Sequence, residues 1–216
     1  MTVPSVFIIG DSISMQYGPY LEAYLQGWCR YLRKTENTHA QEEEDLDVPS
    51  GPNGGDSSMV RRYLQHRAQS KPINTELMLV NCGLHDIKRD PETAAIQVPL
   101  DTYQENLLGI IDSAKKMTPQ LVWIRTTPCD DAIHNQRNKQ FYRYAKDCRA
   151  YNDAADAIMC REGIPEIDLF TLTNNLGPTS YIDHVHFTEE VRQIQAAFIA
   201  GWLHSYIRTH DYEMPT

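Results

Sequence analysis

The sequence lacks any apolar run close to the roughly 20 residues that a helix needs to cross a bilayer. Its first residues, Met-Thr-Val-Pro, also lack the basic and apolar regions of a secretory signal, and the apolar segment Val6 to Ile9 is far too short for one. These absences predict no membrane-spanning segment. If the native chain begins at Met1, they favour a cytoplasmic protein; the alternative is a removed export signal.

Cysteine is scarce and widely spaced. The cysteines are odd in number, and no two of them form the CxxC pair typical of zinc and redox sites. This pattern argues against a disulfide framework and favours reduced thiols. Cys82, at the end of an apolar segment, is expected to be buried and inert.

Positive charge is in deficit, because 20 lysines and arginines face 29 aspartates and glutamates, for a net charge of −9. Nucleic-acid-binding proteins favour a basic face, and an anionic membrane surface would repel this chain. We therefore expect no nucleic-acid partner and no membrane partner. A neutral ester or sugar would be unaffected by the charge, and the oligomeric state is left open.

What the sequence does contain is an alternation of apolar strands and amphipathic helices. Strands are expected at residues 5–9, 28–32, 76–82, 120–126 and 164–169, and helices at 14–26, 57–69, 100–117, 135–162 and 188–208. The alternation predicts an α/β fold, a parallel sheet with helices on both faces. The 216 residues suit one domain, 1–216, without a repeat or linker, and the polar stretch 34–55 is expected to be a surface loop.

The first candidate for chemistry is the tetrapeptide Gly10-Asp11-Ser12-Ile13, which separates the first strand from the first helix. Functional residues of such sheets gather where loops leave the carboxyl ends of the strands. A serine at this position would therefore stand at the functional edge, close to a helix N-terminus that favours negative charge. The alternative is structural, since Asp11 or Ser12 could simply cap the helix.

The second candidate is Asp183-His184-Val185-His186, just before the last helix. If the loop turns, Asp183 can orient the His186 imidazole, which can then take a proton from a serine. One alternative is a solvated loop in which Thr188 caps the helix. Another is a metal site, because Asp183, His184 and His186 are all ligand types. In an extended segment the two histidines would share a face and Asp183 would point away. The segment alone leaves these alternatives open.

Taken together, four short blocks resemble the SGNH/GDSL family of serine esterases and lipases. The first and last blocks are Gly10-Asp11-Ser12 and Asp183-x-x-His186. The second block is matched by Asn53-Gly54-Gly55-Asp56-Ser57-Ser58, and the third by Gly83-Leu84-His85-Asp86. The blocks occur in the family's order and span nearly the whole chain. Each is weak alone, and jointly they are specific.

The resemblance implies a three-layer α/β/α sandwich with a mostly parallel, flavodoxin-like sheet of five strands. It implies that Ser12 is the nucleophile, His186 the base and Asp183 its orienting acid. The backbone N–H groups of Ser12 and Gly55 and the side chain of His85 would form the oxyanion hole. Asp11 and Asp86 would support the site, Asp86 by tying neighbouring loops together. No cofactor or metal is implied.

One residue departs from the family pattern. The family has an asparagine where this chain has His85, and the amide of that asparagine donates to the oxyanion. A neutral imidazole also presents one N–H, so His85 is expected to donate in its place. The alternative is a packed polar residue that leaves only the two backbone donors.

The function expected from the resemblance is hydrolysis of small acyl esters, preferably O-acetyl esters of carbohydrates, because the loops beside the site are polar. A lysophospholipase or thioesterase of the same fold is the nearest alternative. A metal-dependent phosphoesterase would use a different set of side chains: Asp11, His85, Asp86, Asp183 and His186. A catalytically silent binding domain is the third alternative, and the altered third block is the feature that supports it.

Overall fold

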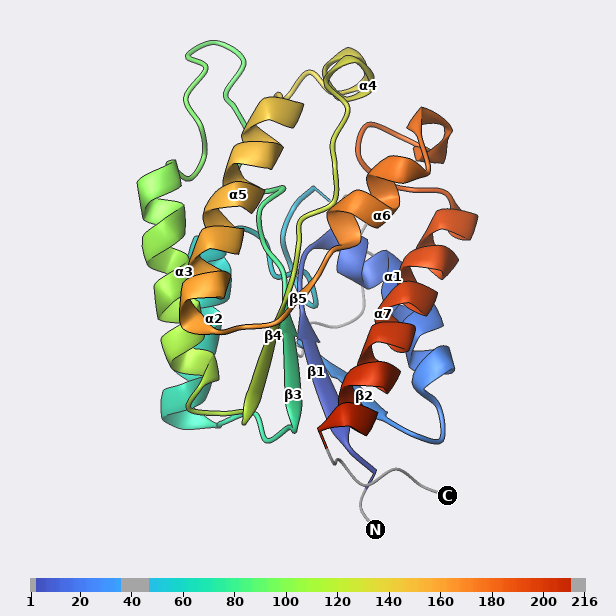
Figure 1. The fold of residues 1–216 in the computed structure, drawn as a ribbon. Coiled ribbons are helices and arrows are strands. Elements are labelled where there is room, and N and C mark those ends of the chain that lie inside the picture. Colours follow the sequence, from blue (N-terminus) through green and yellow to red (C-terminus); the bar gives the residue numbers. More distant parts are fainter. Residues whose placement is uncertain (1–2, 36–46, 211–216) are drawn as a thin grey trace.

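A computed structural model describes residues 3–35 and 47–210 of the chain. Within these ranges, five strands form one sheet in the order β2-β1-β3-β4-β5, and every neighbouring pair is parallel (Figure 1). The strands are β1 (Ser5–Ile9), β2 (Arg30–Arg33), β3 (Leu77–Val80), β4 (Gln120–Ile124) and β5 (Glu166–Ile167). The expected five-stranded parallel sheet is therefore confirmed.

Helices cover both faces of this sheet. Helices α1 and α7 pack together on one face, and α2, α3 and α5 lie on the other (Figure 1). Within the described residues the helices are α1 (Ser12–Leu25), α2 (Ser57–Ser70), α3 (Leu100–Ala114), α4 (Asp131–Arg137), α5 (Ala145–Glu162), α6 (Leu169–Asn175) and α7 (Glu189–Thr209). The arrangement is the expected three-layer α/β/α sandwich.

Burial explains why the central strands form where they do. All residues of β1 and β3 are buried, as their unbroken apolar runs require for strands covered on both faces. Trp123 of β4 is fully buried, as expected for a core residue. The edge strand β2 is partly exposed, which matches its weaker sequence signal.

The prediction of one helix over residues 135–162 is wrong. The chain instead forms α4 and α5, separated by residues 138–144. The side chain of Asn138 accepts hydrogen bonds from the backbone N–H groups of Gln140 and Phe141, which makes a turn. Tyr142 then exchanges two backbone hydrogen bonds with Arg89, in the loop after β3. The backbone N–H and carbonyl of Tyr142 thus bond to a distant loop, whereas a continuous helix would have used them within itself.

The segment around residue 169 also differs from expectation. The strand β5 ends at Ile167, and Leu169 begins helix α6, which the sequence pattern did not indicate. Asp168 ends the strand because its side chain accepts from the backbone N–H of Thr171 and caps the helix. The surface loop expected over 34–55 lies partly outside the described residues, which resume at Asp47.

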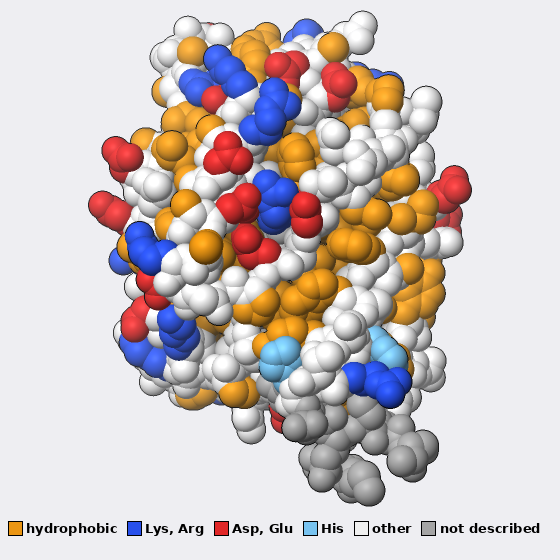
Figure 2. All heavy atoms as spheres, in the orientation of Figure 1, with side chains coloured by type: hydrophobic (Ala, Val, Ile, Leu, Met, Phe, Trp, Pro, Cys, Tyr) orange, Lys and Arg blue, Asp and Glu red, His pale blue; other side chains and the backbone are white. Residues whose placement is uncertain are grey.

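In the described part of the chain, no helix is long and apolar enough to span a membrane. On the face drawn in Figure 2, acidic and basic side chains are interspersed and no basic patch gathers on it. All five cysteines are free thiols; four are buried and Cys160 is exposed.

Candidate active site

Ser12 is the first residue of α1 and follows the carboxyl end of strand β1 after Gly10 and Asp11. Its neighbour Asp11 caps the helix, because Asp11 Oδ1 accepts from the backbone N–H of Ile13 at 3.0 Å. Asp11 therefore accounts for the cap, and the Ser12 hydroxyl is available for another partner. Ser12 is only 4% exposed, so that partner has to come from the protein or from a bound ligand.

The partner is His186, from the far end of the sequence. His186 Nε2 lies 2.9 Å from Ser12 Oγ, and His186 Nδ1 lies 2.7 Å from Asp183 Oδ2. A carboxylate can only accept, so Nδ1 carries the ring proton and Nε2 is left to accept from the serine hydroxyl. This is the tautomer that a general base needs.

The loop that carries Asp183 turns sharply to make this contact. Asp183 Oδ1 accepts from the backbone N–H groups of Val185 and His186, at 2.8 and 2.7 Å. Burial alone would raise the pKa of Asp183, but the hydrogen bonds from His186 and these two backbone groups outweigh it and lower the pKa. Asp183 is therefore charged throughout the neutral range. Thr188 also caps α7, so the capping role and the contact with serine coexist in one segment.

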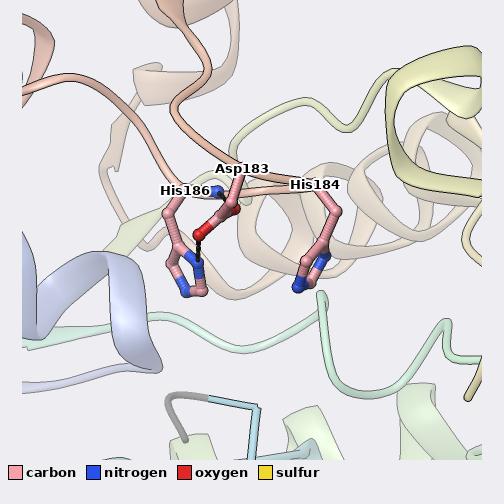
Figure 3. A group of neighbouring side chains, drawn as sticks. All are labelled: Asp183, His184 and His186. Carbon is pink, nitrogen blue, oxygen red and sulfur yellow. Dashed lines mark hydrogen bonds and ion pairs between the residues drawn. The ribbon is translucent and has the colours of Figure 1, made fainter. Parts of the chain in front are cut away.

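The arrangement of Asp183 differs from the extended segment considered above. Figure 3 shows the Asp183 side chain reaching toward His186, with His184 beside them. One ligand atom from each of these residues lies within 4.8 Å of the others, so the group could hold a metal ion. Both ring nitrogens of His184 and of His186 already have partners, however. If His186 coordinated a metal ion, it would lose its hydrogen bond to Ser12 or to Asp183.

His85 follows β3 at the same edge of the sheet and is 1% exposed. Burial, together with the positive charges of Lys88 and Arg143, holds the pKa of His85 well below its ordinary value. The ring is therefore neutral at physiological pH and carries a single N–H. Its Nδ1 is buried and has no hydrogen-bond partner among the residues that the structure describes.

The loop with Gly54 and Gly55 is fastened directly to the turn that precedes Ser12. The backbone N–H of Gly54 donates to the carbonyl of Gly10 at 2.8 Å, and a Cβ on Gly54 would lie only 3.0 Å from that oxygen. Gly55 has a φ of +71°, a conformation that glycine adopts without strain. Its N–H donates to Asn53 Oδ1 at 2.9 Å, so this group already has an acceptor within its own loop.

Asp86 and Asp11 are both buried carboxyls. Both oxygens of Asp86 face the backbone N–H of Ser57, at 3.0 and 3.1 Å, which links the loop after β3 to the start of α2. Burial raises the pKa of Asp86 to about 8 despite these bonds. Burial likewise raises the pKa of Asp11, whose Oδ2 finds no hydrogen-bond partner in the described part of the chain.

Comparison with known proteins identifies the family to which the chain belongs. The sequence profile of the GDSL-like lipase/acylhydrolase family matches residues 8–194, which is most of the chain. The chain belongs to this family. Membership makes it a carboxylic ester hydrolase, and the recognition made from the four blocks is confirmed.

Solved structures with the same fold resemble this hydrolase at low sequence identity. A GDSL-like lipase from Bacteroides thetaiotaomicron is 17% identical with a TM-score of 0.65, over 95% of this chain and 93% of that one. A lipase/acylhydrolase from Enterococcus faecalis is 13% identical with a TM-score of 0.65, over 94% and 96%. A carbohydrate acetylesterase from Sinorhizobium meliloti is 14% identical with a TM-score of 0.56, over 94% and 99%. Among curated proteins, no match is found.

Residues of the loop after β4 line a cavity of about 470 Å³. Asp130 and Asp131 line this cavity together with Tyr181. Neither Ser12 nor His186 lines it. Asp130 caps α4 through the N–H of Ile133, which is a structural role.

Charged and polar side chains surround His184, an arrangement that the sequence did not predict. Arg143 is 1% exposed although it carries a full charge, and Asp47 and His134 complete the group. The sequence offered little to find them, since Arg143 stands in the segment expected to be one long helix. Their contacts depend on loops that meet only in the folded chain.

Proposed function

We propose that this hydrolase cleaves esters through a triad of Ser12, His186 and Asp183. The observation that carries the proposal is the continuous chain of short contacts from Ser12 Oγ through both nitrogens of His186 to Asp183. A serine hydroxyl is a weak nucleophile, and a base that already accepts from it removes the proton as the oxygen attacks. Asp183 stabilises the imidazolium that forms.

In the first half of the reaction, Ser12 Oγ attacks the ester carbonyl and its proton passes to His186 Nε2. The tetrahedral intermediate collapses as His186 returns the proton to the departing alcohol, and an acyl-Ser12 ester remains. Water then attacks this ester, with its proton taken by His186. Release of the acid restores the Ser12 hydroxyl.

The negative charge on the tetrahedral oxygen needs donors in place before it forms. We assign this role to the backbone N–H groups of Ser12 and Gly55 and to the ring N–H of His85. The low pKa of His85 supports the assignment, because the neutral ring keeps one N–H and can donate it without carrying a charge. The Gly55 N–H would exchange or share its present acceptor, Asn53 Oδ1, when the oxyanion forms.

For the substrate we propose a small acyl ester, with an O-acetyl group on a carbohydrate as the preferred case. Two features support it: the fold is shared with a carbohydrate acetylesterase from Sinorhizobium meliloti, and the described part of the loop before α2 is polar. Hydrolysis of longer acyl chains, as in a lysophospholipase or thioesterase, is the competing case.

A panel of p-nitrophenyl acetate, butyrate and octanoate, assayed with and without a chelator, tests the proposal. We expect the acetate to be hydrolysed fastest, without an effect of the chelator, and an acetylated xylan or sugar to release acetate. A maximum at octanoate would overturn the small-acyl assignment. Loss of all activity on chelation would instead favour a metal-dependent phosphoesterase, and turnover of no ester, acetylated sugar or phosphoester would favour a binding domain.

A further inference from the structure

His184 lies in the loop between Asp183 and His186, and both of its ring nitrogens have partners. Nε2 is 2.8 Å from Asp47 Oδ2, and Nδ1 is 3.1 Å from Nδ1 of His134. His134 Nδ1 also lies 3.2 Å from the carbonyl oxygen of His184, which can only accept. His134 Nδ1 therefore carries a proton and donates a hydrogen bond to His184 Nδ1. His184 Nε2 in turn donates to Asp47.

The second oxygen of Asp47 faces a different part of the site. Asp47 Oδ1 forms an ion pair with Arg143 Nη2 at 3.5 Å. Arg143 Nε donates to the carbonyl of Leu84 at 2.7 Å, and Leu84 directly precedes His85. One carboxylate thus faces the loop that carries the proposed base and, through Arg143, the loop that carries the proposed oxyanion donor.

We propose that Asp47 is a positioning residue, whose carboxylate fixes the distance between the triad loop and the His85 loop through His184 and Arg143. The inference rests on the proposed function. It is carried by the contacts above and by their burial, because Arg143 is 1% exposed and the side chains of Asp47 and His184 are each 14% exposed. At this depth the contacts are little screened by solvent.

The charged side chains around Asp47 support its role as a positioning residue. Burial alone would raise the pKa of Asp47, but the hydrogen bond from His184 and the charges of Arg143 and Lys88 outweigh it and lower the pKa. Lys88 Nζ also donates to the Asp47 carbonyl at 2.8 Å, which anchors the backbone here. Burial and the Arg143 charge lower the pKa of His134 to about 3, so its ring keeps one proton. Asp47 therefore stays charged and His134 stays neutral near neutral pH.

Direct removal of the Asp47 carboxylate would leave Arg143 as an uncompensated buried charge and could unfold the protein. The test therefore changes His184 and leaves Asp47 and Arg143 in place. In His184→Gln the amide nitrogen reaches the position of Nε2 and can still donate to Asp47. In His184→Asn the side chain reaches only as far as Nδ1 and loses Asp47. His66→Asn, on the surface of α2, is the matched control for a histidine distant in the fold.

We expect His184→Asn to lower kcat by roughly 10- to 100-fold with little change in KM, because a displacement of about 1 Å in a reacting group has effects of this size. His184→Gln should stay within about threefold of the wild type, and His66→Asn should be unchanged. All variants should melt cooperatively. Unchanged kcat in His184→Asn, or equal losses in the Asn and Gln variants, would overturn the inference.

A second measurement keeps the inference separate from the proposed function. The nitrogen chemical shifts of the His186 ring report its contacts with Ser12 and Asp183 without any turnover. We expect them to change in His184→Asn and to stay near the wild-type values in His184→Gln. If the wild type hydrolyses no ester, the proposed function fails while these shifts still decide the inference. If the wild type is active and the shifts in His184→Asn are unchanged, the inference fails alone.

Discussion

Asp11 and Ser12, which follow β1, have different roles. Asp11 satisfies the N-terminus of α1 through the N–H of Ile13, while Ser12 turns its hydroxyl to His186. Either residue could have been a simple cap by its type. Because the cap is already made by Asp11, loss of the Ser12 hydroxyl should remove chemistry and leave the helix intact.

Ser12→Ala should therefore abolish ester hydrolysis without unfolding the protein. Turnover of p-nitrophenyl acetate and the thermal melting curve, measured on the same preparation, check the two halves of the prediction. Ser70→Ala, at the exposed end of α2, is the matched control and should keep full activity. Retained activity in Ser12→Ala would exclude Ser12 as the nucleophile.

His85 gives a second prediction for a single residue. His85→Ala should cost about 2–4 kcal/mol of transition-state stabilisation, mainly as a fall in kcat, if the ring donates to the oxyanion. His85→Asn restores the amide of the family pattern and should recover most of this loss. Steady-state kinetics on one ester measures both. Equal losses in the two variants, or a loss far below this range in His85→Ala, would assign His85 a packing role.

Between elements, Asp86 connects the loop after β3 to the first turn of α2. Its two oxygens face the backbone N–H of Ser57, and Asn106 of α3 donates to the Ser57 hydroxyl. The link orders the start of α2, which follows the loop of Gly54 and Gly55. The link also costs folding free energy when the carboxyl is ionised, because the carboxyl is buried and its pKa rises from 3.8 to about 8.

That raised pKa predicts how Asp86 affects stability with pH. A carboxyl whose folded pKa is above its unfolded value binds its proton more tightly when folded. Its contribution is therefore fully present at pH below 3.8 and declines as the pH rises toward 8. Asp86→Asn keeps an acceptor for Ser57 and cannot ionise. Its melting temperature relative to the wild type should rise as the pH increases from 5 to about 8, in thermal melts at matched ionic strength; a constant difference would contradict the prediction.

At the scale of the whole molecule, the candidate site is assembled from loops that follow β1, β2 and β3 and from the loop before α7. All meet at the carboxyl edge of the sheet, because parallel strands end on the same side. Residues separated by 174 positions thus come within hydrogen-bond distance. Within the described residues of the site, the fold lowers the pKa of Asp183 and of His85 and raises the pKa of Asp11 and of Asp86.

The pH dependence of kcat/KM should reflect this assembly. Asp183 keeps its charge because its pKa is lowered, and His85 keeps one N–H because its pKa is lowered as well. The proposed base must be unprotonated to accept the serine proton, so kcat/KM should rise with pH on the acid side and reach a plateau. A profile with p-nitrophenyl acetate from acid to alkaline pH measures it. A rate that is flat on the acid side would count against a histidine base.

The sequence predicted most elements because their signals are local. Apolar runs such as 76–82 and 120–126 contain β3 and β4, and the periodic segment 57–69 matches α2 within one residue. The long helix expected over 135–162 failed because the turn at Asn138 and the pairing of Tyr142 with Arg89 depend on contacts outside the segment. Helix α6 was missed because Asp168 stops a strand that the apolar pattern would have continued.

By itself, the sequence determined the α/β class, the order of the strands and the family, since strand patterns and the four blocks can be read residue by residue. Only the tertiary structure decided which nitrogen of His186 faces Ser12, that Asp11 is the residue that caps α1, and that Asp47 and Arg143 lie beside His184. The physical reason is that hydrogen-bond geometry and burial depend on groups far apart in the chain. Local patterns fix which residues are available, and packing fixes which of them meet.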